Sequence, residues 1–259
     1  MQTQLVDLIE SKCLDILALA EYIGDPHEIV LNASVRGINI FFLQNIGCQR
    51  INIFSKFNDT DFHIRNETSY YSIREFRKDG YLPVLLAFVH LPSKLHQSED
   101  DQAAEVIYLR SAIEELENTY RVDGTIVVGD FNMNPYDKGM IGAQQMHSIS
   151  CLRTAQTDTR VIKGREHSFF YNPMWNLLGD FNGAAGSHFY RDSSYYVTFW
   201  NMLDQVILRP SIANRLDKSS LCIMTVINNT QLINANGRPS LSDHLPIFFK
   251  LNLTEGIIT

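Results

Sequence analysis

Residues 125–132 read TIVVGDFN, a short run of β-branched residues that leads directly into two polar side chains. The run predicts a buried strand, with Asp130 and Asn132 at its C-terminal end. Successive residues of a strand face opposite sides, so these two side chains, two positions apart, are expected to point the same way. Strand ends in layered α/β folds often line pockets, and the stretch therefore predicts a functional site.

The tetrapeptide GDFN occurs again at residues 179–182, in a different setting. This second copy follows NPMWNLL and precedes GAAGS, a Gly/Ala/Ser stretch that is typical of a loop. We therefore predict that Asp130 belongs to a site and that Asp180 belongs to an ordinary turn.

The composition indicates a globular chain with a substantial core. It has 259 residues, of which 45% are hydrophobic, and it contains no repeat or linker, so we expect a single domain over residues 1–259. The net charge of -7 argues against a strong basic surface for long nucleic acid, although a locally positive groove is compatible with it. The four cysteines lie far apart, which disfavours a zinc or redox site and favours reduced thiols.

The chain shows neither a membrane span nor a secretory signal. No apolar run approaches the roughly 20 residues that a transmembrane helix needs. The first residues, MQTQLVDLIESK, lack a basic segment followed by an apolar one. We expect a soluble, cytoplasmic protein.

Hydrophobic periodicity predicts many strands and few helices. Helical spacing occurs near the N-terminus, at residues 5–13, and over the amphipathic stretch 99–120. The predicted strands are 14–20, 36–45 paired with 51–57, 69–76 joined to 81–91 by an Asp-Gly turn, 125–128, 167–171, 195–200, 203–209, 221–227 and 246–253. This order indicates an α/β protein of packed sheets flanked by helices.

Further acids and histidines lie at the ends of other predicted strands. Asp204 lies inside the apolar stretch WNMLDQVIL, where burial of an unpaired carboxylate would destabilise the fold. A histidine partner would offset the unfavourable free energy of that burial. Asp243 and His244 precede the apolar run PIFFKL, and His90 and Glu21 end two more apolar runs. Five strand ends with such residues favour one common site.

The motifs LDILALAE, VHLPS, VVGDFN, LDQV and SDHLP, in this order, resemble those of the endonuclease/exonuclease/phosphatase superfamily of metal-dependent phosphoesterases. The resemblance extends over residues 13–251. It implies a deoxyribonuclease-like α/β fold, a four-layer αββα sandwich with two central mixed β-sheets and a site at one end.

The resemblance also implies a divalent metal and an activated water. Glu21 matches the metal-binding glutamate, Asp243 matches the carboxylate beside the metal, and Asp130 matches the aspartate that orients or deprotonates the water. The chemistry requires such groups independently, because an anionic phosphodiester repels nucleophiles and a hard cation offsets the developing charge. Oxygen ligands favour Mg²⁺ or Mn²⁺ over zinc.

The remaining matched residues would contact the phosphate. Asn132 matches the asparagine that holds a phosphate oxygen, and His90 and His244 match the two phosphate-contacting histidines. Asp204 matches the carboxylate that orients the second histidine. Hydrogen-bond donors of this kind stabilise the negative charge that develops during hydrolysis.

The sequence departs from the family pattern at its beginning. Members of the family begin with a strand that ends in an asparagine, whereas here only twenty residues precede Glu21 and the part of them before the strand at 14–20 reads as a helix. Ala20 also replaces a commonly found glutamine. We expect an unpaired sheet strand and a weaker metal site.

The substrate-binding residues are less well defined by the sequence. Arg191 and Trp200 lie in the aromatic segment HFYRDSSYYVTFW and could stack bases, but a core strand with one solvated arginine explains them equally well. Trp175 could lean over the site or anchor its own loop. Four basic residues are candidates for phosphate contacts or ordinary surface residues: Lys94, Lys138, Lys163 and Arg165.

Three functions remain open at this point. The first is hydrolysis of a phosphodiester in nucleic acid or in a nucleotide-like substrate. The second is a phosphomonoesterase that acts on a sugar or lipid headgroup. The third is a non-catalytic member that binds a phosphate ligand or a partner. The expected partner is nucleic acid or a small phosphoester and not a membrane, and the oligomeric state is left open.

Overall fold

The computed structural model describes residues 2–94, 97–193 and 195–256 of the chain. Its helices are α1 (Gln2–Lys12), α2 (Pro26–Val35), α3 (Glu99–Tyr120), α4 (Lys138–Ile141), α5 (Leu152–Ala155) and α6 (Pro210–Ala213). Short 3₁₀ turns are η1 (Asp59–Asp61), η2 (Pro173–Leu177) and η3 (Asp180–Asn182). No helix in these ranges is long and apolar enough to cross a membrane.

A large mixed sheet forms the centre of the molecule, with the strand order β4-β5-β6-β7-β14-β11-β8. Its strands are β4 (Phe62–Glu67), β5 (Tyr71–Phe76), β6 (Val84–His90), β7 (Thr125–Asp130), β14 (Asp204–Leu208), β11 (Phe170–Tyr171) and β8 (Ser148–Ile149). The pairs β6–β7 and β11–β8 are parallel, and the other neighbours are antiparallel.

The layer that faces this sheet consists of two separate antiparallel sheets. One has the order β1-β3-β2, with β1 (Ile16–Ala20), β3 (Ile51–Ser55) and β2 (Phe41–Leu43). The other pairs β15 (Leu216–Ile223) with β18 (Ile247–Leu251). The predicted α/β class and layered architecture are confirmed, but the second central layer is divided because β1 and β18 do not pair.

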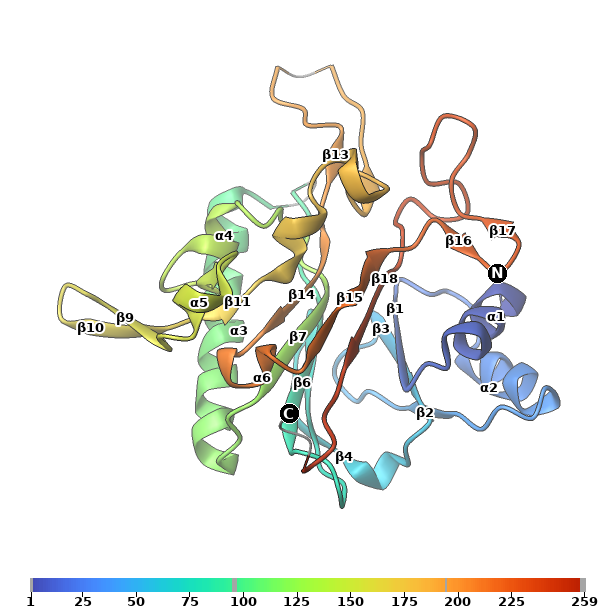
Figure 1. Cartoon of the computed structure of the whole chain (residues 1–259), viewed down its shortest axis with the longest axis horizontal. Helices are drawn as coiled ribbons and strands as arrows, with labels where there is room; N and C mark the ends of the chain where they lie inside the picture. The colour runs from blue at the N-terminus through green and yellow to red at the C-terminus, as the bar shows by residue number, and fades with distance from the viewer. Residues whose placement is uncertain (1, 95–96, 194, 257–259) are drawn as a thin grey trace.

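Helices cover both outer faces of the sheets (Figure 1). On one side, α3 packs Val106, Leu109 and Ile113 against the large sheet. On the other, α1 and α2 cover the β1-β3-β2 sheet through a cluster that includes Val6 and Ile29. The four layers therefore run from α3 through the two sheet layers to α1 and α2.

The bounds of α3 agree with the prediction because its N-terminus is encoded locally. The Ser98 side chain accepts a hydrogen bond from the backbone of Asp101, and the Asp101 side chain accepts one from the backbone of Ser98. This reciprocal capping box satisfies N–H groups that the first helical turn leaves unpaired. Acidic residues in the first turn also oppose the positive end of the helix dipole.

Two sequence predictions fail where aromatic or apolar residues remain exposed. Residues 195–199 form no strand, because Tyr195 and Tyr196 are 99% and 97% exposed and have no core to pack against. Only Trp200 enters a strand, in the hairpin of β12 (His188–Phe189) and β13 (Trp200–Asn201). The strand predicted to be buried at residues 14–20 is present as β1, but Ala18 and Ala20 are exposed.

Two further hairpins lie at the surface: β9 (Thr159–Ile162) with β10 (Arg165–Ser168), and β16 (Val226–Ile227) with β17 (Thr230–Gln231). The β9–β10 hairpin extends away from the central sheets (Figure 1). It therefore adds no residues to the edge of the large sheet where β6 and β7 end.

The buried ring of His147 is expected to make the stability of the fold depend on pH. Its Nδ1 lies 3.0 Å from the carbonyl oxygen of Ser168, the ring packs on Phe169, and burial lowers the pKa of His147 to about 4. The unfolded chain, with a histidine pKa of about 6.5, then binds a proton more readily than the folded protein does. We expect this difference in pKa to add up to roughly 3 kcal/mol to the free energy of unfolding above pH 6.5. This contribution is lost as the pH falls toward 4.

Urea unfolding between pH 7 and pH 4 would measure this contribution. The substitution His147→Gln, which retains an N–H donor but does not titrate, should make the free energy of unfolding less dependent on pH. The matched control, His63→Gln, changes an exposed histidine and should leave the slope unchanged. If the slopes of the wild type and His147→Gln agree, the contribution assigned to His147 is wrong.

Candidate active site

Three ionisable side chains lie in one row across three neighbouring strands. In the strand registers, His90 of β6 is opposite Asp130 of β7, and Asp130 is opposite Asp204 of β14. β6 and β7 end at this row and β14 begins there, at the end of the large sheet where β13 lies (Figure 1). The predicted convergence of these strand ends is thus a direct consequence of strand order and register.

Asp130 and Asn132 contact each other through a turn and not through strand alternation. β7 ends at Asp130, and Asn132 has a left-handed backbone with φ 52°, so the predicted reason for their proximity was wrong. One carboxylate oxygen of Asp130 accepts the backbone N–H of Asn132 at 2.7 Å, and the other accepts its side-chain amide at 2.9 Å. The same amide nitrogen donates to the carbonyl oxygen of Leu91 at 2.8 Å.

Both N–H donors of the Asn132 amide are used inside the protein in this arrangement. An amide NH₂ group has two N–H donors, and here Asp130 and the Leu91 carbonyl occupy both. The Asn132 amide therefore holds the Asp130 carboxylate in place, and its contact with a phosphate oxygen, which would replace one of these hydrogen bonds, stays a prediction.

Gly129 permits the close approach of β6 and β7 at this point. Its φ is 139°, and a Cβ atom at this position would lie 2.1 Å from the carbonyl oxygen of Val89. Any larger residue would displace the strand end that carries Asp130.

The second GDFN copy has a different environment, as predicted. Asp180 belongs to the surface turn η3 and is exposed. The phenylalanine that follows it, Phe181, is 97% exposed, whereas Phe131 in the first copy is fully buried in the core beneath α3. The two copies therefore have the same sequence but different packing.

Asp204 and His244 form the predicted pair. The Nδ1 atom of His244 lies 2.7 Å from a carboxylate oxygen of Asp204. Asp204 is the first residue of β14 and not an interior strand residue as the sequence indicated. Burial alone would lower the pKa of His244, but the hydrogen bond and charge of Asp204 outweigh it and raise the pKa to about 9.

Asp130 is buried beside this pair. Burial and the nearby charge of Asp204 raise the pKa of Asp130 to about 7, and the positive charge of His244 partly opposes the shift. Two carboxylates and one histidine, Asp130, Asp204 and His244, each place a ligand atom within 4.8 Å of the others. The group can therefore accept a proton or a nearby cation.

His90 and Glu21 lie on the other side of Asp130. The Nε2 atom of His90 is 3.5 Å from a Glu21 oxygen and 3.7 Å from an Asp130 oxygen, so both contacts are electrostatic and longer than ordinary hydrogen bonds. Burial lowers the pKa of His90. Glu21 follows β1 with φ 54°, and its side chain is 74% exposed.

Asp243 lies near a histidine that sequence reasoning missed. The ring of His188, on β12, is 4.6 Å from the ring of His244, and the two residues form an isolated β-bridge. His188, Asp243 and His244 form the second group with ligand atoms within 4.8 Å of one another. Glu21, the other predicted metal ligand, belongs to neither of the two groups found among the described residues.

Ser187 joins the segments that carry the Asp204–His244 pair. This fully buried side chain accepts the backbone N–H groups of Leu203 and Asp204 at 3.1 and 3.0 Å. Its carbonyl oxygen accepts the N–H of Leu245 at 2.7 Å. No spacing rule in the sequence indicated Ser187 or His188, because a short surface hairpin brings them to the site.

The contacts found for the candidate substrate residues are with other residues than the three of this row. Trp200 packs edge-on against Phe189, Trp175 packs against Tyr136, and Arg191 is exposed without an ion pair among the described residues. The four basic candidates also have other surroundings: Lys94 pairs with Asp137 at 2.7 Å, Lys138 pairs with Asp100, and Lys163 and Arg165 lie in the β9–β10 hairpin. For Trp200 and Trp175, the packing explanation describes the observed contacts.

Similar solved structures share the fold of this chain. Neither a protein-family model nor a curated protein sequence matches it. The 3' phosphatase NExo from Neisseria, bound to a product DNA hairpin, is 14% identical with a TM-score of 0.57, over 96% of this chain and 93% of that one. Truncated TDP2 from Caenorhabditis elegans is 17% identical with a TM-score of 0.54, over 96% and 91%.

ANGEL2, described as a 2',3'-cyclic phosphatase, is 11% identical with a TM-score of 0.55, over 95% of this chain and 84% of that one. Together with the αββα layers, these matches show that the chain shares its fold with these three solved proteins, in agreement with the fold that the family resemblance implied.

Proposed function

We propose that the protein is a divalent-metal-dependent phosphoesterase, whose preferred substrate is a phosphodiester in nucleic acid or in a nucleotide-like molecule. One observation carries the proposal. A buried carboxylate, Asp130, lies between His90 and the Asp204–His244 pair at the strand ends of a fold shared with phosphatases.

Asp130 is suited to accept the proton of an attacking water. Its pKa of about 7 lies near neutral pH, where a general base combines an available basic form with sufficient proton affinity. Asn132 fixes the orientation of the carboxylate through two hydrogen bonds. In the hydrolysis step, one water proton moves to Asp130 and the water oxygen forms the new bond to phosphorus. The bond from phosphorus to the leaving oxygen breaks, and that oxygen departs with the bonding pair and takes up a proton from the solvent.

His244 is suited to stabilise the developing negative charge on the phosphate. Its pKa of about 9 keeps the ring protonated at neutral pH, and Asp204 holds it through Nδ1, so that the other ring N–H can donate. His90 lies on the other side of Asp130 and is the second candidate contact to the phosphate.

The donor set suits a hard divalent cation. Asp130 and Asp204 bring two carboxylates together, and Glu21 and Asp243 add exposed carboxylates on either side. Mg²⁺ and Mn²⁺ prefer oxygen ligands, and Mg²⁺ retains several waters, so a few carboxylates are sufficient to hold it. We propose Glu21 and Asp243 as its protein ligands; when bound, such an ion offsets negative charge on the phosphate.

Titration with Mg²⁺ tests this assignment. We expect activity that needs millimolar Mg²⁺, is lost with excess chelator, and increases when Mn²⁺ replaces Mg²⁺. The substitution Glu21→Gln should raise the Mg²⁺ concentration for half-maximal activity by about tenfold, with a smaller change in substrate KM. Glu166→Gln, an exposed substitution on β10, is the matched control and should change neither value. Full turnover in excess chelator would contradict the metal mechanism.

A substrate panel distinguishes this function from its alternatives. Purified protein would be incubated with Mg²⁺ or Mn²⁺ and plasmid DNA, a single-stranded oligonucleotide, bis-nitrophenyl phosphate or inositol phosphates. Cleavage of the first three supports a phosphodiesterase, and release of phosphate only from inositol phosphates supports the phosphomonoesterase. Binding without turnover of any compound would support a non-catalytic pocket.

A further inference from the structure

Three side chains that can bind a metal converge beside the row of ionisable residues. One ring nitrogen of His188, one ring nitrogen of His244 and one carboxylate oxygen of Asp243 lie within 4.8 Å of one another. The centroids of the two imidazole rings are 4.6 Å apart, and the rings are tilted by 44°. The group thus contains two imidazoles, whereas the ligands proposed above for Mg²⁺, Glu21 and Asp243, are both carboxylates.

The backbone fixes the two histidines relative to each other. His188 and His244 form an antiparallel β-bridge, and the N–H of Leu245 donates to the carbonyl oxygen of Ser187 at 2.7 Å. The buried hydroxyl of Ser187 accepts the backbone N–H of Asp204 at 3.0 Å. Because the backbone is held at these points, rotation of the side chains is the movement that would bring the ligand atoms to the 2.0–2.2 Å or so that a bound metal requires.

Each histidine has a ring nitrogen available for a metal. Asp204 binds the Nδ1 atom of His244 at 2.7 Å, so Nε2 is the nitrogen that remains. A carboxylate on the remote nitrogen of a ligating histidine fixes the orientation of the ring and increases its basicity. The Nδ1 atom of His188 is buried and has no hydrogen-bond partner among the described residues. Burial of an unpaired polar atom is unfavourable, and a bound ion would offset that loss.

The ligand set selects the class of metal. Mg²⁺ prefers oxygen ligands and gives up its waters reluctantly, so two imidazoles suit it poorly. Zn²⁺ binds imidazole strongly, and two histidines with one carboxylate and an open position form a common zinc set. The ion must also displace the proton that Asp204 helps His244 to retain, which again favours a metal with a high affinity for imidazole.

We propose that His188, Asp243 and His244 form a second cation site, which binds Zn²⁺ or a similar imidazole-binding metal. The site shares only Asp243 with the ligands proposed for Mg²⁺. The exposed position of Asp243 opens the group to solvent, so that an ion can enter and water can complete its coordination.

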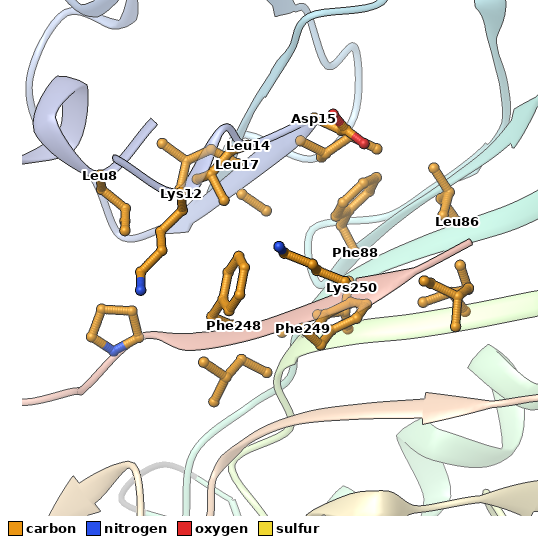
Figure 2. Close-up of a pocket in the computed structure, with 18 of the residues that line it drawn as sticks. Leu8, Lys12, Leu14, Asp15, Leu17, Leu86, Phe88, Phe248, Phe249 and Lys250 are labelled. Atoms are coloured by element: carbon orange, nitrogen blue, oxygen red, sulfur yellow. The ribbon is translucent and has the colours of Figure 1, made fainter. Parts of the chain in front are cut away.

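The site is separate from the large cavity between β1 and β18. That cavity has a volume of about 780 Å³ and is lined mainly by apolar side chains, such as Leu86 and Phe88 of the large sheet (Figure 2). None of the three proposed ligands contributes to its lining. A metal held by these ligands would therefore lie outside the apolar cavity.

Zn²⁺ in this site would oppose the proposed hydrolysis. It would occupy the nitrogen of His244 that donates to the phosphate, and it would compete with Mg²⁺ for Asp243. We therefore expect Zn²⁺ to inhibit the Mg²⁺-dependent reaction. This consequence rests on the proposed function, whereas binding of the metal does not.

Titration of the metal-free protein with Zn²⁺ tests the site directly. Calorimetry would be carried out without Mg²⁺ or substrate, after the exposed thiols of Cys13 and Cys151 are blocked. We expect about one ion per chain, and the substitution His188→Gln should weaken the affinity at least tenfold, because it removes a ligand. The matched control, His63→Gln, changes an exposed histidine of β4 and should leave the affinity unchanged. Equal affinity of the wild type and His188→Gln would overturn the proposal.

Co²⁺ in place of Zn²⁺ reports on the ligands. A four- or five-coordinate Co²⁺ ion with histidine ligands absorbs visible light much more strongly than a six-coordinate ion with oxygen ligands. We expect the strong bands in the wild type and in His63→Gln, and their loss in His188→Gln. A weak spectrum of the six-coordinate kind in the wild type would contradict a histidine site.

Inhibition by Zn²⁺ separates this site from the proposed Mg²⁺ site. Each variant would be compared with its own rate in Mg²⁺ alone, and the Zn²⁺ concentration for half-inhibition should be about tenfold higher in His188→Gln than in the wild type. Equal inhibition of the two would contradict inhibition through His188. A protein that binds Zn²⁺ through His188 but hydrolyses no phosphoester would contradict the proposed function and support the cation site.

Discussion

Replacing Asp130 by asparagine should abolish phosphoester hydrolysis, with a rate loss on the order of a thousandfold or more, because the variant cannot accept the proton of the attacking water. The fold should be retained, although the asparagine side chain can accept only one of the two hydrogen bonds that Asn132 donates to Asp130. Asp130 is 5% exposed, and burial and Asp204 both raise its pKa, so a neutral amide of the same size removes an unfavourable buried charge.

The second GDFN copy supplies the matched control for this experiment. Asp180→Asn changes the same residue type in the same tetrapeptide, but on an exposed turn, and should alter the rate by less than about threefold. Rates of both variants would be measured at saturating metal, together with thermal unfolding. Equal losses at the two positions, or collapse of the fold in Asp130→Asn alone, would contradict the role assigned to Asp130.

The Asp204–His244 pair should behave as one unit. Asp204→Asn and His244→Ala should each lower kcat/KM on the order of a hundredfold or more, because either change removes the oriented, protonated ring. The double variant should lose little more than either single variant, whereas independent contributions would multiply to about ten-thousandfold. Nearly multiplicative losses would show that the two residues act separately.

An independent readout separates this pairing from a general loss of structure. In metal-free protein, Asp204→Asn should lower the pKa of His244 from about 9, as followed by NMR of the imidazole, because the hydrogen bond and charge of Asp204 raise it. Asp61→Asn removes a carboxylate that pairs with Lys78 at 3.1 Å near the opposite end of β5. This control should change neither the pKa of His244 nor the rate.

Much of the local structure could be predicted from short windows of the sequence. The helix α3 has the predicted bounds, and the ends of β5, β6, β7 and β14 lie within three residues of their predicted limits. The choice between the two GDFN copies also agrees with their observed packing, since Phe131 is buried and Phe181 is exposed. These features depend on periodicity, caps and neighbouring residues, all of which lie close together in the chain.

Other features depend on contacts between distant segments. The two donors of Asn132 are used within the protein because Leu91 of the neighbouring segment lies beside it. His188 and Ser187 reach the site because a hairpin folds back onto the segments that carry Asp204 and His244. The sequence around these residues contains no period or spacing from which such contacts follow.

The sequence by itself determined the layered α/β class and the strand-end positions of His90 and Asp130, and its resemblance to a known family implied the pairing of Asp204 with His244. The missing first strand already predicted an unpaired sheet strand, but only the tertiary structure decided that the open edges belong to β1 and β18 and face one cavity. The physical reason is that side-chain alternation is encoded within each strand, whereas strand order and register depend on which distant edges satisfy one another's hydrogen bonds.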